Sequence, residues 1–190
     1  MSTGPTRRAL RDATQAVHDR LDRVPVLRPL TSPTLTPDQY RAALVALHGF
    51  HAPLETRLGA SGRLALLCAD LATLGVDATH LPVMDGLPEL SAAPARLAAR
   101  YVLDGSAHGG RAMLPNVTRA LGFDGSRGAT FLASAGIDAK AEWSALLTRL
   151  EAEVATPESR ALACAAALAL FESLERWLER CPLSSPARRR

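Results

Sequence analysis

The chain has 190 residues, of which 47% are apolar and only 4% are aromatic. This length fits one hydrophobic core better than two, and a core of Leu, Ala and Val favours packed helices over a β-sandwich. No stretch approaches the roughly 18 uninterrupted apolar residues that a membrane span requires, and the N-terminal residues lack the apolar segment of a secretory signal. We therefore expect one soluble, all-α domain that neither enters a membrane nor is exported by that route.

The formal net charge is +3, and the chain ends in three consecutive arginines that follow Pro182 and Pro186. A charge run of this size usually belongs to solvated surface, so we predict a domain over residues 1–181 and a basic tail over 182–190. No recognition motif for nucleic acid accompanies the charge. The three cysteines have no paired spacing, which argues against disulfides or a zinc site and fits a reducing cytoplasm.

The first predicted helix follows from apolar residues that recur every three or four positions from Leu10 onward, and it ends before Pro25. The next segment, 24–37, contains four prolines and is predicted to be a loop. It closes at Thr36-Pro37-Asp38-Gln39, a capping box with proline at the first position of the second helix. A third helix is expected over residues 63–74, and a connection containing proline and glycine follows over 76–93.

The fourth predicted helix begins near Pro94 but contains Gly105, Gly109 and Gly110 before its apolar pattern resumes at Met113. Each glycine inside a helix costs about 0.5–1 kcal/mol relative to alanine, so three glycines need a compensating role. A short fifth helix is predicted around 126–134, followed by a sixth and a seventh that begin at caps, Asp138 and Thr156-Pro157-Glu158. The expected fold is thus all-α with about seven helices.

His18 lies at the edge of the apolar stripe of the first helix, and Arg11 and Asp22 fall within about 40° of it on the same side. A histidine at such a border can bind a metal through one ring nitrogen while a partner holds the other. The alternative is a partly buried histidine with a structural role. Residues His48 and His51 lack a carboxylate at metal-ligand spacing, so surface or packing roles are favoured for them.

Gly105 and Gly109 lie one turn apart on the same face of the fourth helix. Their missing Cβ atoms would let the backbone approach a flat partner closely and let the helix bend. Close packing against another helix is the alternative.

Three stretches carry a resemblance to a known family, and they occur in the family's order over nearly the whole chain. They are Leu10–His18 (LRDATQAVH), Tyr101–Arg111 (YVLDGSAHGGR) and Phe131–Trp143. In these stretches the chain resembles the haem oxygenases, most closely the bacterial subgroup associated with bacteriophytochromes.

The resemblance implies a helical fold in which haem lies between the first helix and the fourth. His18 would be the proximal iron ligand, Asp22 would support it, and Arg11 would lie near a haem propionate. The opposite haem face would be covered by the distal residues Gly105, Ser106, Gly109 and Gly110.

The family's activity is also implied by the resemblance. Haem is both cofactor and substrate, and oxygen attack at a meso carbon yields biliverdin, CO and iron. Distal glycines would steer O₂ along the porphyrin, and Ser106 with backbone carbonyls would hold water that delivers protons. The implied partners are O₂, an electron donor such as ferredoxin or a flavin reductase, and a bacteriophytochrome that receives the product.

His108 is a departure from the subgroup, which usually has Gly-Ser-Thr-Leu-Gly-Gly where this chain has Gly-Ser-Ala-His-Gly-Gly. Its imidazole has three possible positions: toward solvent or the outer shell of the site, toward a distal water, or on the iron itself. An iron-bound His108 would block O₂ and make the chain a non-enzymatic haem-binding or sensor protein. A further alternative is a helical module that has kept the fold and lost haem.

Overall fold

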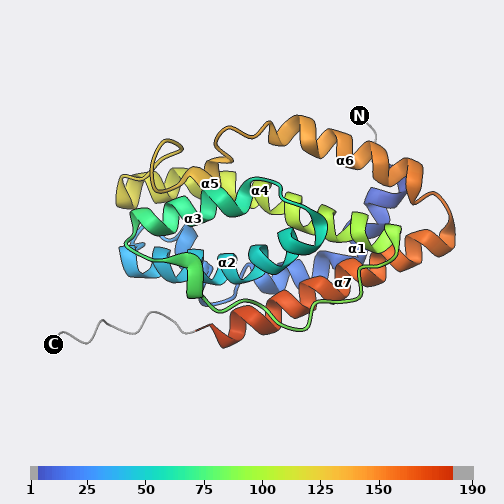
Figure 1. Ribbon diagram of the computed structural model, residues 1–190, viewed down its shortest axis with the longest axis horizontal. Helices are drawn as coiled ribbons and strands as arrows, with labels where there is room; N and C mark the ends of the chain where they lie inside the picture. Colours follow the sequence, from blue (N-terminus) through green and yellow to red (C-terminus); the bar gives the residue numbers. More distant parts are fainter. Residues whose placement is uncertain (1–3, 182–190) are drawn as a thin grey trace.

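Seven α-helices joined by turns and two 3₁₀ segments form the computed structural model (Figure 1), which describes residues 4–181. The helices are α1 (Pro5–Leu21), α2 (Pro37–Leu58), α3 (Arg63–Thr73), α4 (Ala93–Leu121), α5 (Thr130–Ala133), α6 (Ala139–Glu153) and α7 (Pro157–Arg180). The short segments are η1 (Arg28–Thr31) and η2 (Ala78–His80), and no strand forms within the described range. The all-α prediction is therefore confirmed, whereas the predicted basic tail, 182–190, lies outside the described residues.

The predicted helix starts are set by local caps. The Thr36 hydroxyl accepts a hydrogen bond from the Gln39 N–H, and the Gln39 side chain accepts one from the Thr36 N–H. Thr156 caps α7 in the same way, and the Asp138 carboxylate caps α6. These bonds satisfy N–H groups that have no partner inside the helix, which is why sequence located these boundaries well.

The fifth helix is shorter than predicted and begins only at Thr130. The Asp124 carboxylate accepts hydrogen bonds from the N–H groups of Ser126 and Arg127, which fixes a turn. Gly128 then adopts a φ of +76°, a conformation that favours glycine and interrupts a helix. The helix expected from residue 126 is therefore corrected to a turn followed by one helical turn.

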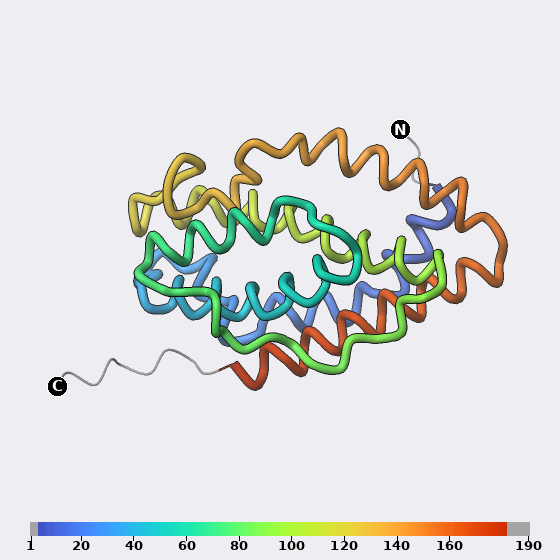
Figure 2. Tube along the Cα trace, in the orientation of Figure 1, coloured from blue at the N-terminus to red at the C-terminus, as the bar shows by residue number. Residues whose placement is uncertain are grey.

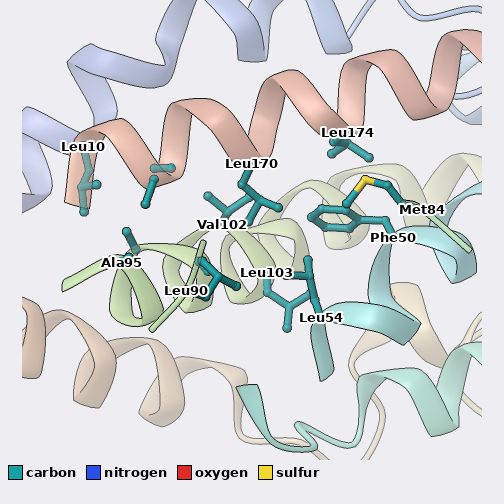
Figure 3. Close-up of a cluster of buried hydrophobic side chains, with 14 of the residues drawn as sticks. Leu10, Phe50, Leu54, Met84, Leu90, Ala95, Val102, Leu103, Leu170 and Leu174 are labelled. Carbon is teal, nitrogen blue, oxygen red and sulfur yellow. The ribbon is translucent and has the colours of Figure 1, made fainter. Parts of the chain in front are cut away.

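Helix α7 is the element on which α1 and α4 both pack, while α6 lies against α4 and touches α1 (Figures 1 and 2). Direct packing between α1 and α4 is slight in comparison. Figure 3 shows Leu170 of α7 facing Val102 of α4, and Leu174 of α7 near Phe50 of α2. This apolar cluster fixes the spacing between the first helix and the fourth.

A second apolar cluster joins η1, α2, α3 and α5 to the C-terminal half of α4. Polar bonds hold this end together: the buried Asp70 carboxylate accepts the N–H groups of Thr130 and Phe131 at the start of α5. The Tyr40 hydroxyl donates to the carbonyl of Gly128. Helix α2 contributes to both clusters and so connects the two ends of the molecule.

The helices of the described residues do not combine the length and apolar character needed to cross a bilayer. The cysteines of the same residues, Cys68, Cys164 and Cys181, are free thiols.

Candidate functional site

The first turn of α1 is held by α6 rather than by its own cap. The N-cap residue Gly4 offers no side chain, and the Glu151 carboxylate accepts the N–H groups of Thr6 and Arg7 at 3.1 and 2.9 Å. The Thr6 hydroxyl also donates to the carbonyl of Val154 at 2.8 Å. At its other end, α1 is joined to α7 by a bidentate pair between Arg20 and Glu175. Both ends of the helix that carries His18 are therefore fixed.

Arg11 lies near Tyr101 of α4. Burial raises the pKa of the Tyr101 phenol, and the positive charges of Arg7 and Arg11 oppose that effect. The helices α1 and α4 run in the same general direction (Figure 1), so a step along α1 can be compared with an equal step along α4. His18 follows Arg11 by seven residues, about 10.5 Å of helix, and the same step from Tyr101 reaches the segment 105–110. The segment 105–110 therefore lies about as far beyond Tyr101 along α4 as His18 lies beyond Arg11 along α1.

His18 is accessible and already has a carboxylate partner. Its side chain is 57% exposed, and its Nδ1 lies 3.7 Å from the Asp22 carboxylate. The Phe171 ring of α7 meets the imidazole edge to face at 6.1 Å between centroids. Asp19 is a further exposed neighbour, with ligand atoms of His18, Asp19 and Asp22 within 4.8 Å of one another. With Nδ1 directed at Asp22, Nε2 is the nitrogen available to a metal.

The three glycines of α4 have different surroundings, although the helix runs through them without interruption. A Cβ on Gly109 would meet nothing within 4 Å, whereas one on Gly110 would lie 3.3 Å from the backbone of Leu132 in α5. A Cβ on Gly105 would lie 3.7 Å from the Trp143 indole of α6. Gly110 therefore serves close helix packing, and Gly109 is an exposed position with open space beside its backbone.

An aromatic group covers the α4 face beside Gly105. The Trp143 ring lies 5.1 Å from that of Tyr101 and 5.0 Å from that of His108. His108 is exposed at the helix surface and meets the indole at an interplanar angle of 63°. Ser106 donates its hydroxyl proton to the carbonyl of Leu103 at 2.6 Å. The imidazole of His108 therefore lies against an aromatic neighbour on α6.

Behind the glycine segment lies a buried polar cluster, made of residues from α2, α3 and α4. His51 is completely buried, and its Nδ1 is 3.6 Å from the Glu55 carboxylate. Burial lowers the pKa of His51, so the ring is neutral. Burial alone would raise the pKa of Glu55, but the His51 ring and the N–H groups of Ser61 and Leu64 lower it to about 2.

Asp104 is the member of this cluster that directly precedes Gly105. Its carboxylate lies 3.0 Å from Nε of Arg100 and 3.9 Å from Nε of the buried Arg63. Burial raises the pKa of Asp104, and the two arginines oppose that rise. Arg63 also donates to the Ser134 hydroxyl at 3.0 Å.

Several atoms of the cluster are buried and lack a hydrogen-bond partner among the described residues. They are both ring nitrogens of His51, Nε of Arg63, Oδ1 of Asp104 and, on the next turn of α2, Nδ1 of His48. Buried polar groups left alone cost about 1–3 kcal/mol each, and ordered water commonly satisfies them. Sequence reasoning assigned no role to Arg63 or Asp104. The sequence did contain a signal for these two residues, because Asp104 and Arg63 are charged residues within helical stripes that are otherwise apolar.

Taken together, these features describe a helical protein with an accessible histidine on α1 and, on α4, a glycine-containing segment with a buried polar cluster behind it. The fold is shared with bacterial haem oxygenases. The NO- and CO-bound haem oxygenase of Neisseria meningitidis aligns over 99% of this chain and 96% of its own, with a TM-score of 0.75 and 22% identity. The haem oxygenase of Leptospira interrogans aligns over 90% and 96%, with a TM-score of 0.70 and 17% identity.

The likeness is one of structure rather than sequence. No protein-family model matches the chain, and no curated protein is significantly similar to it. The chain thus has the haem oxygenase fold over nearly its whole length, as predicted.

Proposed function

We propose that this protein is a haem oxygenase that opens haem to biliverdin, CO and iron. The observation that carries the proposal is His18, an exposed histidine with a carboxylate beside its Nδ1, on the first helix of a fold shared over at least 90% of the chain with two haem oxygenases.

The residues present fit haem. A histidine with one nitrogen on a carboxylate and the other free is a suitable iron ligand, and His18 with Asp22 has this arrangement. The open position at Gly109 allows a flat ring to approach the backbone of α4. The guanidinium groups of Arg7 and Arg11 near Tyr101 would bind the propionates.

Bound haem supplies the iron chemistry that activates O₂ for attack on a meso carbon. The protein's part is to orient the ring and to provide protons. Asp104 Oδ1 is buried, and the raised pKa of this carboxyl makes it easier to protonate than an exposed aspartate. We assign to Asp104 the holding and release of a proton toward the distal side of Gly105, with His51 and Arg63 orienting the water between them. Ser106, whose own proton is directed to Leu103, would accept a hydrogen bond from that water.

The remaining parts of the proposal concern the cell. Haem oxidation needs electrons, and we assign their supply to a ferredoxin or flavin reductase in the cytoplasm. The bilin product would serve a bacteriophytochrome, as the sequence resemblance suggests.

The test is reconstitution with haemin, followed by addition of reductant and O₂. We expect the haem Soret band to disappear while a biliverdin band and CO form. The His18→Ala variant should lose the wild-type haem spectrum, while His80→Ala, which changes an exposed histidine at the end of η2, should retain it. A haem complex that survives prolonged reduction in air would refute the enzyme and support the haem-binding or sensor alternative.

The contact between His108 and Trp143 gives a separate expectation for the distal side. Since this imidazole lies against an indole, the His108→Ala variant should form a haem complex with the same coordination spectrum as the wild type. A low-spin wild-type spectrum that becomes high-spin in His108→Ala would show that His108 binds iron and would favour the sensor.

A further inference from the structure

A basic surface pocket lies at the far end of the molecule's α4–α6 side, outside the site described above. Its volume is about 390 Å³, and its walls are the end of α2 (58–60), the first two turns of α4 (93–100) and the last turn of α6 (149–153). We call it the arginine pocket, because Arg96, Arg100 and Arg149 line it. Glu153 is the single carboxylate in its wall, so the lining carries a net formal charge of +2.

The three guanidinium groups use few of their N–H donors within the protein. Arg96 donates to the carbonyl of Arg57 at 3.1 Å, and Arg149 donates through Nε to Glu153 at 2.9 Å. Arg100 donates to the carbonyl of Gly59 at 3.0 Å and to Asp104. Since each guanidinium has five N–H donors, most of these donors have no acceptor among the described residues.

Helix capping explains only part of this arrangement. The bonds from Arg96 and Arg100 satisfy carbonyl groups at the end of α2, but they need one donor each and do not involve Arg149. Ala92, the N-cap of α4, provides no side-chain cap, so the first turn of that helix adds positive potential to the same wall. Planar guanidinium groups that converge in this way suit the oxygen atoms of phosphate and carboxylate groups.

We propose that the arginine pocket binds a small oxyanion with two or more negative charges, for which inorganic phosphate is the simplest probe. The ligand would contact Arg100, whose Nε lies 3.0 Å from the Asp104 carboxylate. The pocket is therefore separated by a single side chain from the buried polar cluster behind Gly105. Binding itself does not depend on haem, so the proposal stands apart from the proposed function.

The test is calorimetric titration of the haem-free full chain with sodium phosphate, with ionic strength held constant by sodium chloride. We expect saturable binding with one site per chain. The Arg96→Ala/Arg149→Ala variant should bind at least tenfold more weakly, while Arg23→Ala/Arg119→Ala, which removes two exposed arginines elsewhere, should bind like the wild type. Equal weakening in both double variants, or unsaturable heats in the wild type, would overturn the proposal.

A single substitution gives an independent result that does not depend on removing arginines. Glu153→Gln deletes the carboxylate of the pocket at a side chain that is 44% exposed, so it should leave the fold intact. The affinity for phosphate should rise severalfold, because the repulsion disappears and Arg149 is released. Unchanged or weaker binding in Glu153→Gln would contradict an anion site here.

Discussion

The role available to each histidine in this protein depends on its burial as much as on its residue type. His18 and His108 are exposed, whereas His48 and His51 lie inside the fold, and His51 is close to charged groups. The sequence pattern made His18 a candidate ligand, because Arg11 and Asp22 lie near it on the same helix. It could not identify the His51 site, because Arg63 and Asp104 come from other helices and only the tertiary fold brings them close.

Stability should depend on pH through His48 and His51. Burial lowers the pKa of both, so the unfolded chain binds their protons first, near pH 6.5. Their contribution is therefore complete above pH 6.5 and is lost as the pH falls toward the folded-state values. We expect the free energy of unfolding in urea to fall between pH 7.5 and 5.5, with both histidines contributing to the loss.

Histidine variants separate the effect of His48 and His51 from that of an exposed histidine. The fall in unfolding free energy should shrink in His51→Gln and in His48→Gln and should be unchanged in the exposed His80→Gln. An identical pH dependence in all four proteins would contradict the assignment.

Gly109 should show a conflict between stability and ligand binding. Since a Cβ there meets no atom within 4 Å, Gly109→Ala should stabilise the haem-free protein by about 0.5–1 kcal/mol through helix propensity. The same methyl group would stand in the way of the ring, so haem affinity should fall. Gly110→Ala, which meets the Leu132 backbone, should instead destabilise the haem-free protein. Haem titration and urea unfolding of both variants measure these effects, and undiminished haem binding by Gly109→Ala would place the ligand elsewhere.

At the scale of elements, helix starts that are capped by neighbouring residues were predicted well from the sequence. A helix start that is capped by a residue far along the chain was not. The caps at Thr36, Asp138 and Thr156 are formed by residues within three positions of each helix start, so sequence alone revealed them. The cap of α1 comes from Glu151, more than 140 residues away, and no local pattern contains it. The fifth helix was predicted too long because residues 126–129, which complete the turn that Asp124 begins and include Gly128, were expected to be helical.

Glu151 should matter more than an ordinary surface glutamate. Glu151→Ala removes the acceptor for two N–H groups at the start of α1, and losses of such caps cost about 0.5–2 kcal/mol. Urea unfolding should show this loss, whereas Glu153→Ala on the same helix should change stability by less than about 0.5 kcal/mol. Equal effects of the two substitutions would mean that the cap contributes nothing in solution.

At the scale of the whole molecule, the fold class followed from composition and periodicity, while the way the helices pack did not. Helix α2 takes part in both apolar clusters and meets α7 at Gly49, where a Cβ would overlap the indole of Trp177. The Trp177 N–H donates to the carbonyl of Ala46, so the indole is not free to move aside. The two clusters should therefore unfold as one unit.

Gly49→Ala tests this unity. Overpacking at a buried contact typically costs about 1–3 kcal/mol, so we expect the unfolding midpoint to fall. Tryptophan fluorescence and far-UV circular dichroism should report the same fall. Two separated transitions would show that the clusters unfold independently.

Helix α7 supports α1 on one flank and α4 on the other, and its middle contains the buried Ala166 and Ala167. A bulkier residue at either position would push the two flanking helices apart without touching anything bound between them. Under the proposed function, selectivity for the bound ring would thus depend on this remote helix as well as on the residues nearest the ring.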